Sequence, residues 1–377
     1  MLFIKDIILA KLQKNFIRWL YFLHLWEIFI NTPEVGKVNL WFNQPLKRKI
    51  MASADKRAIW FTVVNVYAAS KKASELWEEA ENGLKSRNVI YHGNRTGRSG
   101  NAMEITFDAC AAGYRKFVAV GGDGTVHDVL NGIAAYVDWT SGNSAPLAFS
   151  DFTLAVIPLG SGNDWIRSTG VPKDIDKAVA LLADPVMAAQ DVVKVTMLDD
   201  SGCPLSVSYM ANIGGVGIDA RVCEKVNSKK TQGKRGKILY VTSLLQAIRE
   251  RVPAMARVEC DGRTVFDGSF LSMAFGVGKY SGGGMRQTPA AVLDDGLLDV
   301  TVIPELPLLR IAREAPRLFT GTFLDVPELV AVKGRSVTVY PQDNSSSEPV
   351  EVDGEVVGKG PVRFEVMDSR INIVVGK

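Results

Sequence analysis

The stretch AVGGDGTVHDVLNG, residues 119–132, places three glycines and one aspartate between an apolar run and a helical pattern. Gly121, Gly122 and Gly124 can adopt positive φ and let backbone N–H groups approach a ligand without a Cβ in the way. Thr125 is expected to cap the following helix, whose N-terminus favours anions. Asp123 would repel a phosphate unless a divalent cation lay between them. The stretch favours a phosphate-binding loop; the alternative is a tight strand–helix turn with Asp123 as a local cap.

Strands alternate with helices around this loop. Strand patterns at 59–67, 88–94, 116–121 and 152–159 alternate with helical patterns that begin near Leu76, at 101–113 and at 126–137. This alternation predicts an α/β fold with a doubly wound parallel sheet, in which ligands bind beyond the carboxyl ends of the strands. The turn PLGSGNDW, 158–165, adds Gly160, Ser161, Asn163 and Asp164 at the same edge. Taken alone, this turn is equally an Asx-type helix start; with the first loop it predicts one polyphosphate cradle.

The periodicity changes near residue 190. Short strands with alternating apolar residues and hairpin turns follow, for example DVVKVTMLD, LSVSYMANIG, SFLSMAFGVG and PVEVDGEVV, and two helices are expected near 236–250 and 306–320. This pattern predicts a second, mostly antiparallel β domain. The fold class is therefore α/β with an N-terminal nucleotide domain and a C-terminal β-rich domain.

Composition excludes several classes of protein. The four cysteines are scattered without a CxxC pair and the chain has three histidines, which argues for reduced thiols in the cytoplasm and against a zinc site. Residues 1–50 hold eight Lys/Arg against three Asp/Glu, and subtraction from the totals of 44 and 41 leaves 36 basic and 38 acidic residues in 51–377. The main body therefore has no nucleic-acid signature.

The basic segment at the N-terminus contains WLYFLHLWEIFI, 19–30, which is interrupted by His24 and Glu27. It falls short of the roughly 20 apolar residues of a spanning helix. Two interpretations stay open: an amphipathic helix on a membrane surface, or a dispensable extension before a natural start at Met51.

An ordered set of motifs resembles the bacterial-type diacylglycerol kinase family, which includes sphingosine and ceramide kinases and is more distantly similar to NAD kinases and phosphofructokinases. The motifs are GGDGT at 121–125, Asn131-Gly132, PLGSGND at 158–164, SGGGM at 281–285, DDGLLDV at 294–300 and VDGE at 352–355. The resemblance runs from about residue 58 to the C-terminus. It implies an N-terminal extension at 1–57, a nucleotide domain at 58–188 and a lipid-substrate domain at 189–357, with ATP between the domains. The last strand, near 358–377, would return to the nucleotide domain.

Carried over residue by residue, the resemblance implies a nucleotide site. The residues implied are Asn65, Thr96, Gly121, Gly122, Asp123, Gly124, Thr125, Val126, His127, Gly160, Ser161, Asn163 and Asp164. The first loop departs from the family pattern Asn-Pro-x-Ser-Gly, because NVYAAS keeps Asn65 but lacks the proline and the glycine. That departure weakens the assignment of the first loop.

The resemblance also implies catalytic and metal roles. Transfer to an alcohol needs a carboxylate near the acceptor hydroxyl, and Glu355 or Asp353 would be that base, with Glu355 slightly favoured. The VDGE stretch also reads as a β-hairpin. Asp123 would act through Mg²⁺. Asp295 and the carbonyl of Leu297 would hold a structural Mg²⁺, with Val292 adding a backbone oxygen; the alternative is a Gly-centred turn.

The function implied is an ATP- and Mg²⁺-dependent lipid kinase. It would phosphorylate diacylglycerol or a related lipid alcohol to phosphatidic acid or its equivalent, as a cytoplasmic protein peripherally bound to the inner face of the membrane. The segment KKTQGKRGK, 229–237, would contact anionic lipid headgroups or be a solvated loop. A homodimer is left open. The alternatives are a sphingoid-base or ceramide-type kinase, an NAD kinase, and a nucleotide-binding regulatory protein without transfer activity.

Overall fold

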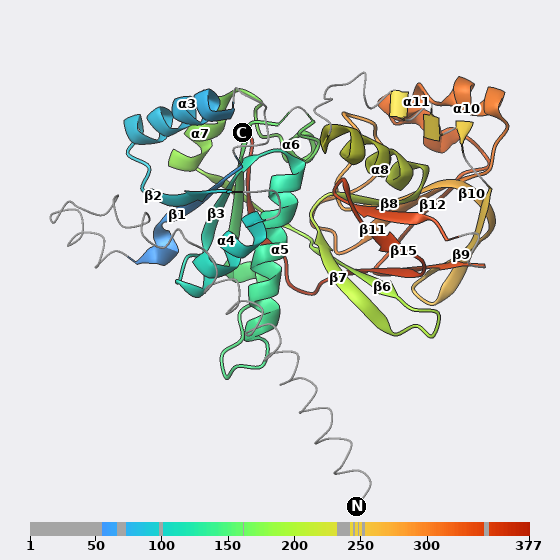
Figure 1. Ribbon diagram of the computed structural model, residues 1–377, viewed down its shortest axis with the longest axis horizontal. Coiled ribbons are helices and arrows are strands. Elements are labelled where there is room, and N and C mark those ends of the chain that lie inside the picture. Colours follow the sequence, from blue (N-terminus) through green and yellow to red (C-terminus); the bar gives the residue numbers. More distant parts are fainter. Residues whose placement is uncertain are drawn as a thin grey trace, which may run out of the picture. The chain divides into compact units, whose positions relative to one another are not determined.

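Figure 1 shows the computed structural model of the chain. The residues it describes are 55–65, 73–97, 101–160, 162–231, 242–243, 246–247, 249–250, 253–342 and 347–377. Residues 56–377 form one compact unit. The expected extension lies outside the described residues up to residue 54.

The first sheet has six strands in the order β2-β1-β3-β4-β17-β5. These are β1 (Trp60–Val64), β2 (Tyr91–Arg95), β3 (Lys116–Gly121), β4 (Thr153–Pro158), β5 (Val186–Gln190) and β17 (Ile371–Val375). Every strand pair is parallel except β17 with β5. Every residue of β1 and of β4 is buried, as expected for strands covered on both faces. The carboxyl ends of β1, β3 and β4 therefore meet at one edge.

Helices cover this sheet in two pairs, α3 (Ala73–Ser86) against α7 (Ile175–Ala183) and α4 (Asn101–Ala111) against α5 (Asp123–Thr140). Figure 1 shows the pairs on opposite sides of the sheet. α3 buries Ala73, Trp77, Ala80 and Leu84, which recur at the spacing of one helix face. The short α6 (Trp165–Thr169) follows the second glycine-rich loop.

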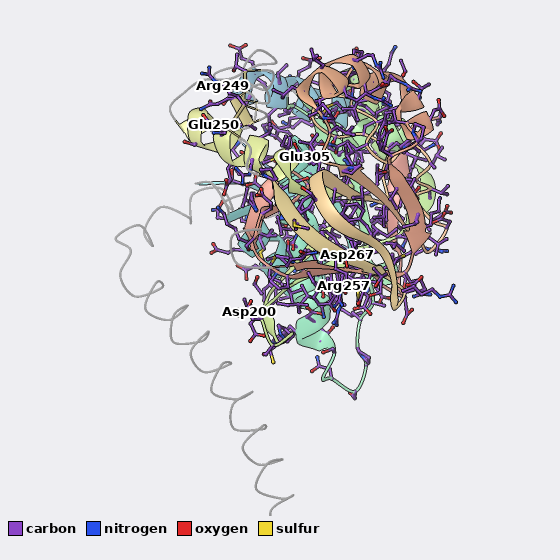
Figure 2. The ribbon with its side chains drawn as sticks, turned by 90° about the vertical axis from the view of Figure 1, so that its right-hand side faces the viewer. Asp200, Arg249, Glu250, Arg257, Asp267 and Glu305 are labelled. Atoms are coloured by element: carbon purple, nitrogen blue, oxygen red, sulfur yellow. The ribbon has the colours of Figure 1, made fainter. Side chains whose placement is uncertain are left out.

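The second sheet has eleven strands, and all of its pairs are antiparallel. They are β6 (Val193–Leu198), β7 (Pro204–Met210), β8 (Ile213–Gly217), β9 (Ala254–Cys260), β10 (Arg263–Gly276), β11 (Leu298–Pro304), β12 (Val330–Gly334), β13 (Ser336–Pro341), β14 (Pro349–Val352), β15 (Glu355–Lys359) and β16 (Val362–Val366). The long β10 pairs with β9 in its first half, where Asp267 opposes Arg257 (Figure 2). In its second half it pairs with β8 and β11.

The expected fold class is confirmed: a mostly parallel sheet with helices precedes an antiparallel β-rich part. The final strand β17 lies between β4 and β5 in the first sheet. The helix expected at 306–320 is present as α10 (Leu308–Glu314) and α11 (Arg317–Thr320). Of the segment 236–250, residues 242–243, 246–247 and 249 are helical.

Local sequence patterns did not predict α8 (Ile218–Thr231) or the strands β5 and β12. α8 is mostly polar and, among its described side chains, buries few apolar residues, so it carries little helical periodicity. Among the described residues, no helix combines the length and the apolar character needed to cross a bilayer.

Candidate active site

The first glycine-rich loop joins β3 to α5 at the carboxyl edge of the first sheet. β3 ends at Gly121 and α5 begins at Asp123, with Gly122 as the N-cap residue. The prediction that Thr125 caps the helix is wrong, because the helix begins before Thr125 and its N-cap carries no side-chain hydrogen bond. Instead, the Thr125 Oγ1 accepts a hydrogen bond of 3.1 Å from Asn65 Nδ2 at the end of β1. Thr125 thus ties the loop to the neighbouring strand.

Close packing requires glycine at Gly121 in this loop and at Gly160 in the second glycine-rich loop. Among the described glycines, those with positive φ do not include Gly121, Gly122 or Gly124, so the expectation of left-handed backbone there is wrong. A Cβ on Gly121 would lie 2.1 Å from Thr125 Oγ1, and a Cβ on Gly160 would lie 2.7 Å from the Gly122 Cα. Real Cβ atoms do not approach other atoms so closely, so the two glycine-rich loops touch backbone to backbone.

Asp123 joins the two loops. Its Oδ2 accepts a hydrogen bond from Asp164 N and its Oδ1 accepts one from Trp165 N, each at 3.0 Å. The carboxylate therefore caps the start of α6 and does not cap its own helix. Burial raises the pKa of Asp123, while the Trp165 N–H lowers it. Each carboxylate oxygen keeps a further lone pair.

Other predicted nucleotide residues surround these loops. Thr96, at the end of β2, is 4% exposed, and its Oγ1 has no hydrogen-bond partner among the described residues. A buried hydroxyl without a partner is uncommon, and a polar group of a nucleotide fits it. Asn163 has φ 52° and donates from Nδ2 to Gly160 O at 2.7 Å. Val126 is buried in the core, and Ser161 lies outside the described residues.

Asp164 faces the β-rich part. Its Oδ2 accepts a hydrogen bond of 2.6 Å from Gly283 N in the SGGGM stretch, and its Oδ1 lies 3.2 Å from Arg167 Nε. Burial raises the pKa of this carboxyl, and the Gly283 N–H opposes the shift. Both oxygens are engaged with protein groups, so Asp164 connects the second loop to residues 281–285.

The VDGE stretch forms the expected hairpin between β14 and β15. Asp353 and Gly354 have φ 53° and 89°, as a type I′ turn requires, and Val352 pairs with Glu355. Asp353 Oδ2 accepts from Ala211 N and Oδ1 accepts from Asn212 N, both at 2.9 Å. This carboxylate is thereby fixed to the turn between β7 and β8.

A third partner of Asp353 is His127, on the second turn of α5. His127 Nδ1 lies 3.2 Å from Asp353 Oδ2, and the Asp353 side chain is 3% exposed. Burial lowers the pKa of His127, but the Asp353 carboxylate raises it, and the net direction is upward. Glu355, by contrast, is exposed, and its Oε1 lies 3.4 Å from the position of a Cβ on Gly124. The hairpin therefore presents one buried, bonded acid and one exposed acid beside the glycine loop.

Asn131 and Gly132 connect α5 to its neighbours. Asn131 Nδ2 donates to Tyr209 O at 2.8 Å and to His127 O at 2.9 Å, and its Oδ1 accepts from Tyr209 N at 2.8 Å. One amide side chain thus satisfies both backbone groups of Tyr209, and Figure 1 shows α5 beside β7. A Cβ on Gly132 would lie 2.6 Å from Met103 O, so this glycine allows α4 to pack against α5.

Three acids near the hairpin were not predicted. Burial raises the pKa of Asp128 to about 6, and the nearby Glu355 adds to the shift while His127 opposes it. Asp219 accepts a hydrogen bond from Ser272 Oγ, and Glu351 Oε2 accepts one from Gly354 N at 2.7 Å. Burial raises the pKa of both carboxyls. Glu351 is the one charged residue in the otherwise apolar strand PVEV, which is buried at every position. That local signal could have identified it.

The loop expected to hold a structural Mg²⁺ precedes β11. Asp295 Oδ1 accepts a hydrogen bond of 3.0 Å from Leu297 N, and Asp295 Oδ2 lies 3.2 Å from Lys333 Nζ. Val292 is 43% exposed. Within the part of the chain that the structure describes, no three His, Cys, Asp or Glu side chains gather to hold a metal ion. The Lys333 ammonium therefore already contacts one carboxylate oxygen of Asp295, the predicted metal ligand.

The basic segment 229–237 lies outside the described residues beyond Thr231, and the side chains of 229–231 are not described either.

Comparisons with known proteins agree with this architecture. Residues 60–195 match the diacylglycerol kinase catalytic domain, and residues 212–375 match the YegS C-terminal NAD kinase beta sandwich-like domain. A "probable lipid kinase YegS-like" of Stenotrophomonas maltophilia is 30% identical over 280 residues, which cover 74% of this chain and 84% of the relative. One of Xanthomonas axonopodis is 29% identical, with 78% and 90% covered.

A crystal structure of a diacylglycerol kinase from Bacillus anthracis superposes with a TM-score of 0.64 at 22% identity and covers 85% of this chain and 97% of that one. At this identity the likeness shows the fold.

Proposed function

We propose that this chain, which belongs to the YegS-like lipid kinase family, transfers the γ-phosphoryl group of ATP to a hydroxyl of diacylglycerol or a similar membrane lipid alcohol. The product would be phosphatidic acid or its equivalent. The family makes the chain a lipid kinase and thus an ATP-using transferase; the diacylglycerol acceptor and the use of Mg²⁺ are the proposal. The observation that carries the proposal is the exposed Glu355 carboxylate beside Gly124, at the start of α5.

Glu355 is the proposed general base. A base must come within hydrogen-bond reach of the proton it removes, and an exposed carboxylate at the glycine loop can meet both an acceptor hydroxyl and the phosphate end of a nucleotide. Asp353 is less suited, because two backbone amides and His127 already surround its oxygens. We assign Asp353 a positioning role: it holds the hairpin turn that carries Glu355 against α5.

The nucleotide would lie at the carboxyl edge of the first sheet. ATP supplies the phosphoryl group, and the N-terminus of α5 offers its unpaired N–H groups to the phosphates. Thr96 Oγ1, which is buried without a partner among the described residues, suits a nucleotide polar group. Asp123 remains the proposed contact for a nucleotide-bound Mg²⁺, in addition to capping α6. These groups neutralise and orient the phosphates, which is the main task of a kinase site.

The test is a transfer assay with γ-labelled ATP, Mg²⁺ and separate mixed micelles of diacylglycerol, monoacylglycerol, sphingosine and ceramide, with NAD as a soluble acceptor. Products are separated by thin-layer chromatography. We expect label in phosphatidic acid, loss of at least ~10²-fold in Glu355→Gln, and normal turnover in Glu365→Gln, which alters an exposed acid on β16. Label in a sphingoid or NAD product alone would replace the diacylglycerol acceptor, and no label in any lipid would reject the proposal.

Because the acceptor resides in a bilayer, we also propose peripheral association with the inner face of the membrane, with residues 229–237 contacting anionic headgroups. Each basic residue near such a surface contributes about 1 kcal/mol. Cosedimentation with phosphatidylserine vesicles at low and high salt tests this. We also propose domain boundaries at 57/58, 188/189 and 357/358. We propose that the chain is active without residues 1–50 and that it forms a homodimer.

A further inference from the structure

Lys333, on β12, reaches into the loop that precedes β11. Its Nζ donates to Ala290 O at 3.0 Å and to Asp295 Oδ2 at 3.2 Å, and it lies 3.0 Å from Asp299 Oδ2. Three oxygens from one loop and one strand therefore converge on a single ammonium. We propose that Lys333 is the resident cation of the 290–299 loop and takes the place of the divalent metal that the motif DDGLLD would otherwise bind.

The strand register fixes this arrangement. β11 and β12 are antiparallel, and Asp299 is the cross-strand partner of Lys333; both strands are labelled in Figure 1. Asp299 is 6% exposed, and a carboxylate so far from water requires a compensating charge. The strand register thus places the Lys333 ammonium beside the buried Asp299 carboxylate.

The chemistry of the two cations is different. Mg²⁺ demands about six oxygens at about 2.0–2.1 Å and keeps several waters. An ammonium has three N–H donors. Lys333 Nζ donates to Ala290 O and Asp295 Oδ2, and it forms an ion pair with Asp299 Oδ2, which has no hydrogen-bond partner among the described residues. The ammonium contacts Asp295, the side chain on which the predicted metal site depends, and its charge repels a second cation there. A metal at Asp295 and the Leu297 carbonyl therefore does not fit the residues present while Lys333 stays in place.

A second protein cation anchors the same loop. Asp191, between β5 and β6, accepts from Arg370 Nε at 2.7 Å through Oδ1 and from Gly296 N at 2.6 Å through Oδ2. Arg370 directly precedes β17. The loop is thus held between the two sheets by covalently attached charges, and its order is expected to be independent of free divalent ions.

The test is thermal unfolding of the full chain without nucleotide, so that it does not depend on kinase activity. For the wild type, we expect Tm to change by less than about 1 °C between excess EDTA and 5 mM Mg²⁺ or Ca²⁺, because an ion that does not bind the folded state adds no stability to it. Lys333→Met should lower Tm by about 3 °C or more in EDTA, because it leaves a buried carboxylate unpaired. Mg²⁺ or Ca²⁺ should then raise the Tm of this variant.

Two matched variants sharpen the result. Lys333→Arg keeps a cation and should remain insensitive to EDTA. Lys85→Met removes an exposed i,i+4 ion pair with Glu81 and should leave Tm unchanged. Elemental analysis of the dialysed wild type should find less than about 0.1 Mg or Ca per chain, a level at which mass action adds no stability. A wild-type Tm that falls in EDTA, one bound metal per chain, or a Lys333→Met variant without any divalent response would each overturn the proposal.

Discussion

The two acids of the VDGE hairpin give the sharpest test of the site, because they lie two residues apart in different surroundings. In Asp353→Asn, the side chain keeps one acceptor oxygen, but its NH₂ group must face the N–H of Ala211 or Asn212, each now bonded at 2.9 Å. A lost charge-assisted bond and an unsatisfied buried N–H cost about 1–3 kcal/mol each. Because Asn relieves part of the carboxylate's desolvation, we expect a net loss of about 2–4 kcal/mol, or about 4–8 °C in Tm.

Glu355→Gln should behave in the opposite way. Its side chain is exposed, so Tm should stay within about 1 °C of the wild type, while turnover on lipid falls at least ~10²-fold. Differential scanning fluorimetry and initial rates at saturating MgATP measure both effects on the same preparations. A wild-type Tm in Asp353→Asn would refute the positioning role, and more than about a tenth of normal turnover in Glu355→Gln would refute the base.

Three further predictions follow from single contacts. Asn131→Asp places a carboxylate oxygen against Tyr209 O, now 2.8 Å from the amide nitrogen, and should lower the unfolding free energy by about 3–5 kcal/mol in urea titrations; a loss under about 1 kcal/mol would show that the hydrogen bonds between Asn131 and the Tyr209 backbone contribute little to stability. Gly160→Ala puts a Cβ 2.7 Å from the Gly122 Cα and should weaken binding of a fluorescent ATP analogue about tenfold or more by separating the loops; unchanged affinity would contradict the packing argument. For Asp128, the pKa is raised from 3.8 to about 6, so the folded protein binds this proton more tightly and stability falls as pH rises from about 4 to about 6. Asp128→Asn should remove this decline and gain about 2–3 kcal/mol at pH 8, and equal pH profiles for both proteins would refute it.

Local patterns were sufficient to predict most of the first sheet. The strand WFTVV is buried at every position, and the stripe Ala73, Trp77, Ala80, Leu84 lies on one face of α3, so the sequence itself records which faces are covered. The sequence of α8 carries no such pattern. That helix buries Ile218 and Val222 but carries polar residues along most of its length, and its position depends on contacts with β8 and β14 that no local pattern encodes.

The sequence predicted the positions of the site's glycines but only part of the physical reason for them. The sequence shows that Gly121, Gly122 and Gly160 occupy loop positions, and positive φ is the usual explanation for glycine in a loop. The structure instead requires glycine at 160 because two loops, separated by about one strand and one helix along the chain, touch backbone to backbone at Gly122. It requires glycine at 121 because a Cβ there would collide with the Thr125 side chain. Only the pairing of β3 with β4, which brings Gly121 opposite Pro158, makes that contact necessary.

The roles of the acids depend on partners that are distant in the sequence. Asp353 is bonded to His127 across 226 residues, and this contact, absent for Glu355, separates a positioning acid from a candidate base. Asp299 and Lys333 meet because β11 and β12 pair in one register. A shift of one residue would turn Lys333 to the other face of the sheet and leave the oxygens of Asp295 and Asp299 free to bind a metal. The sequence of the DDGLLD loop is therefore compatible with either cation, and the residue opposite Asp299 on the neighbouring strand decides between them.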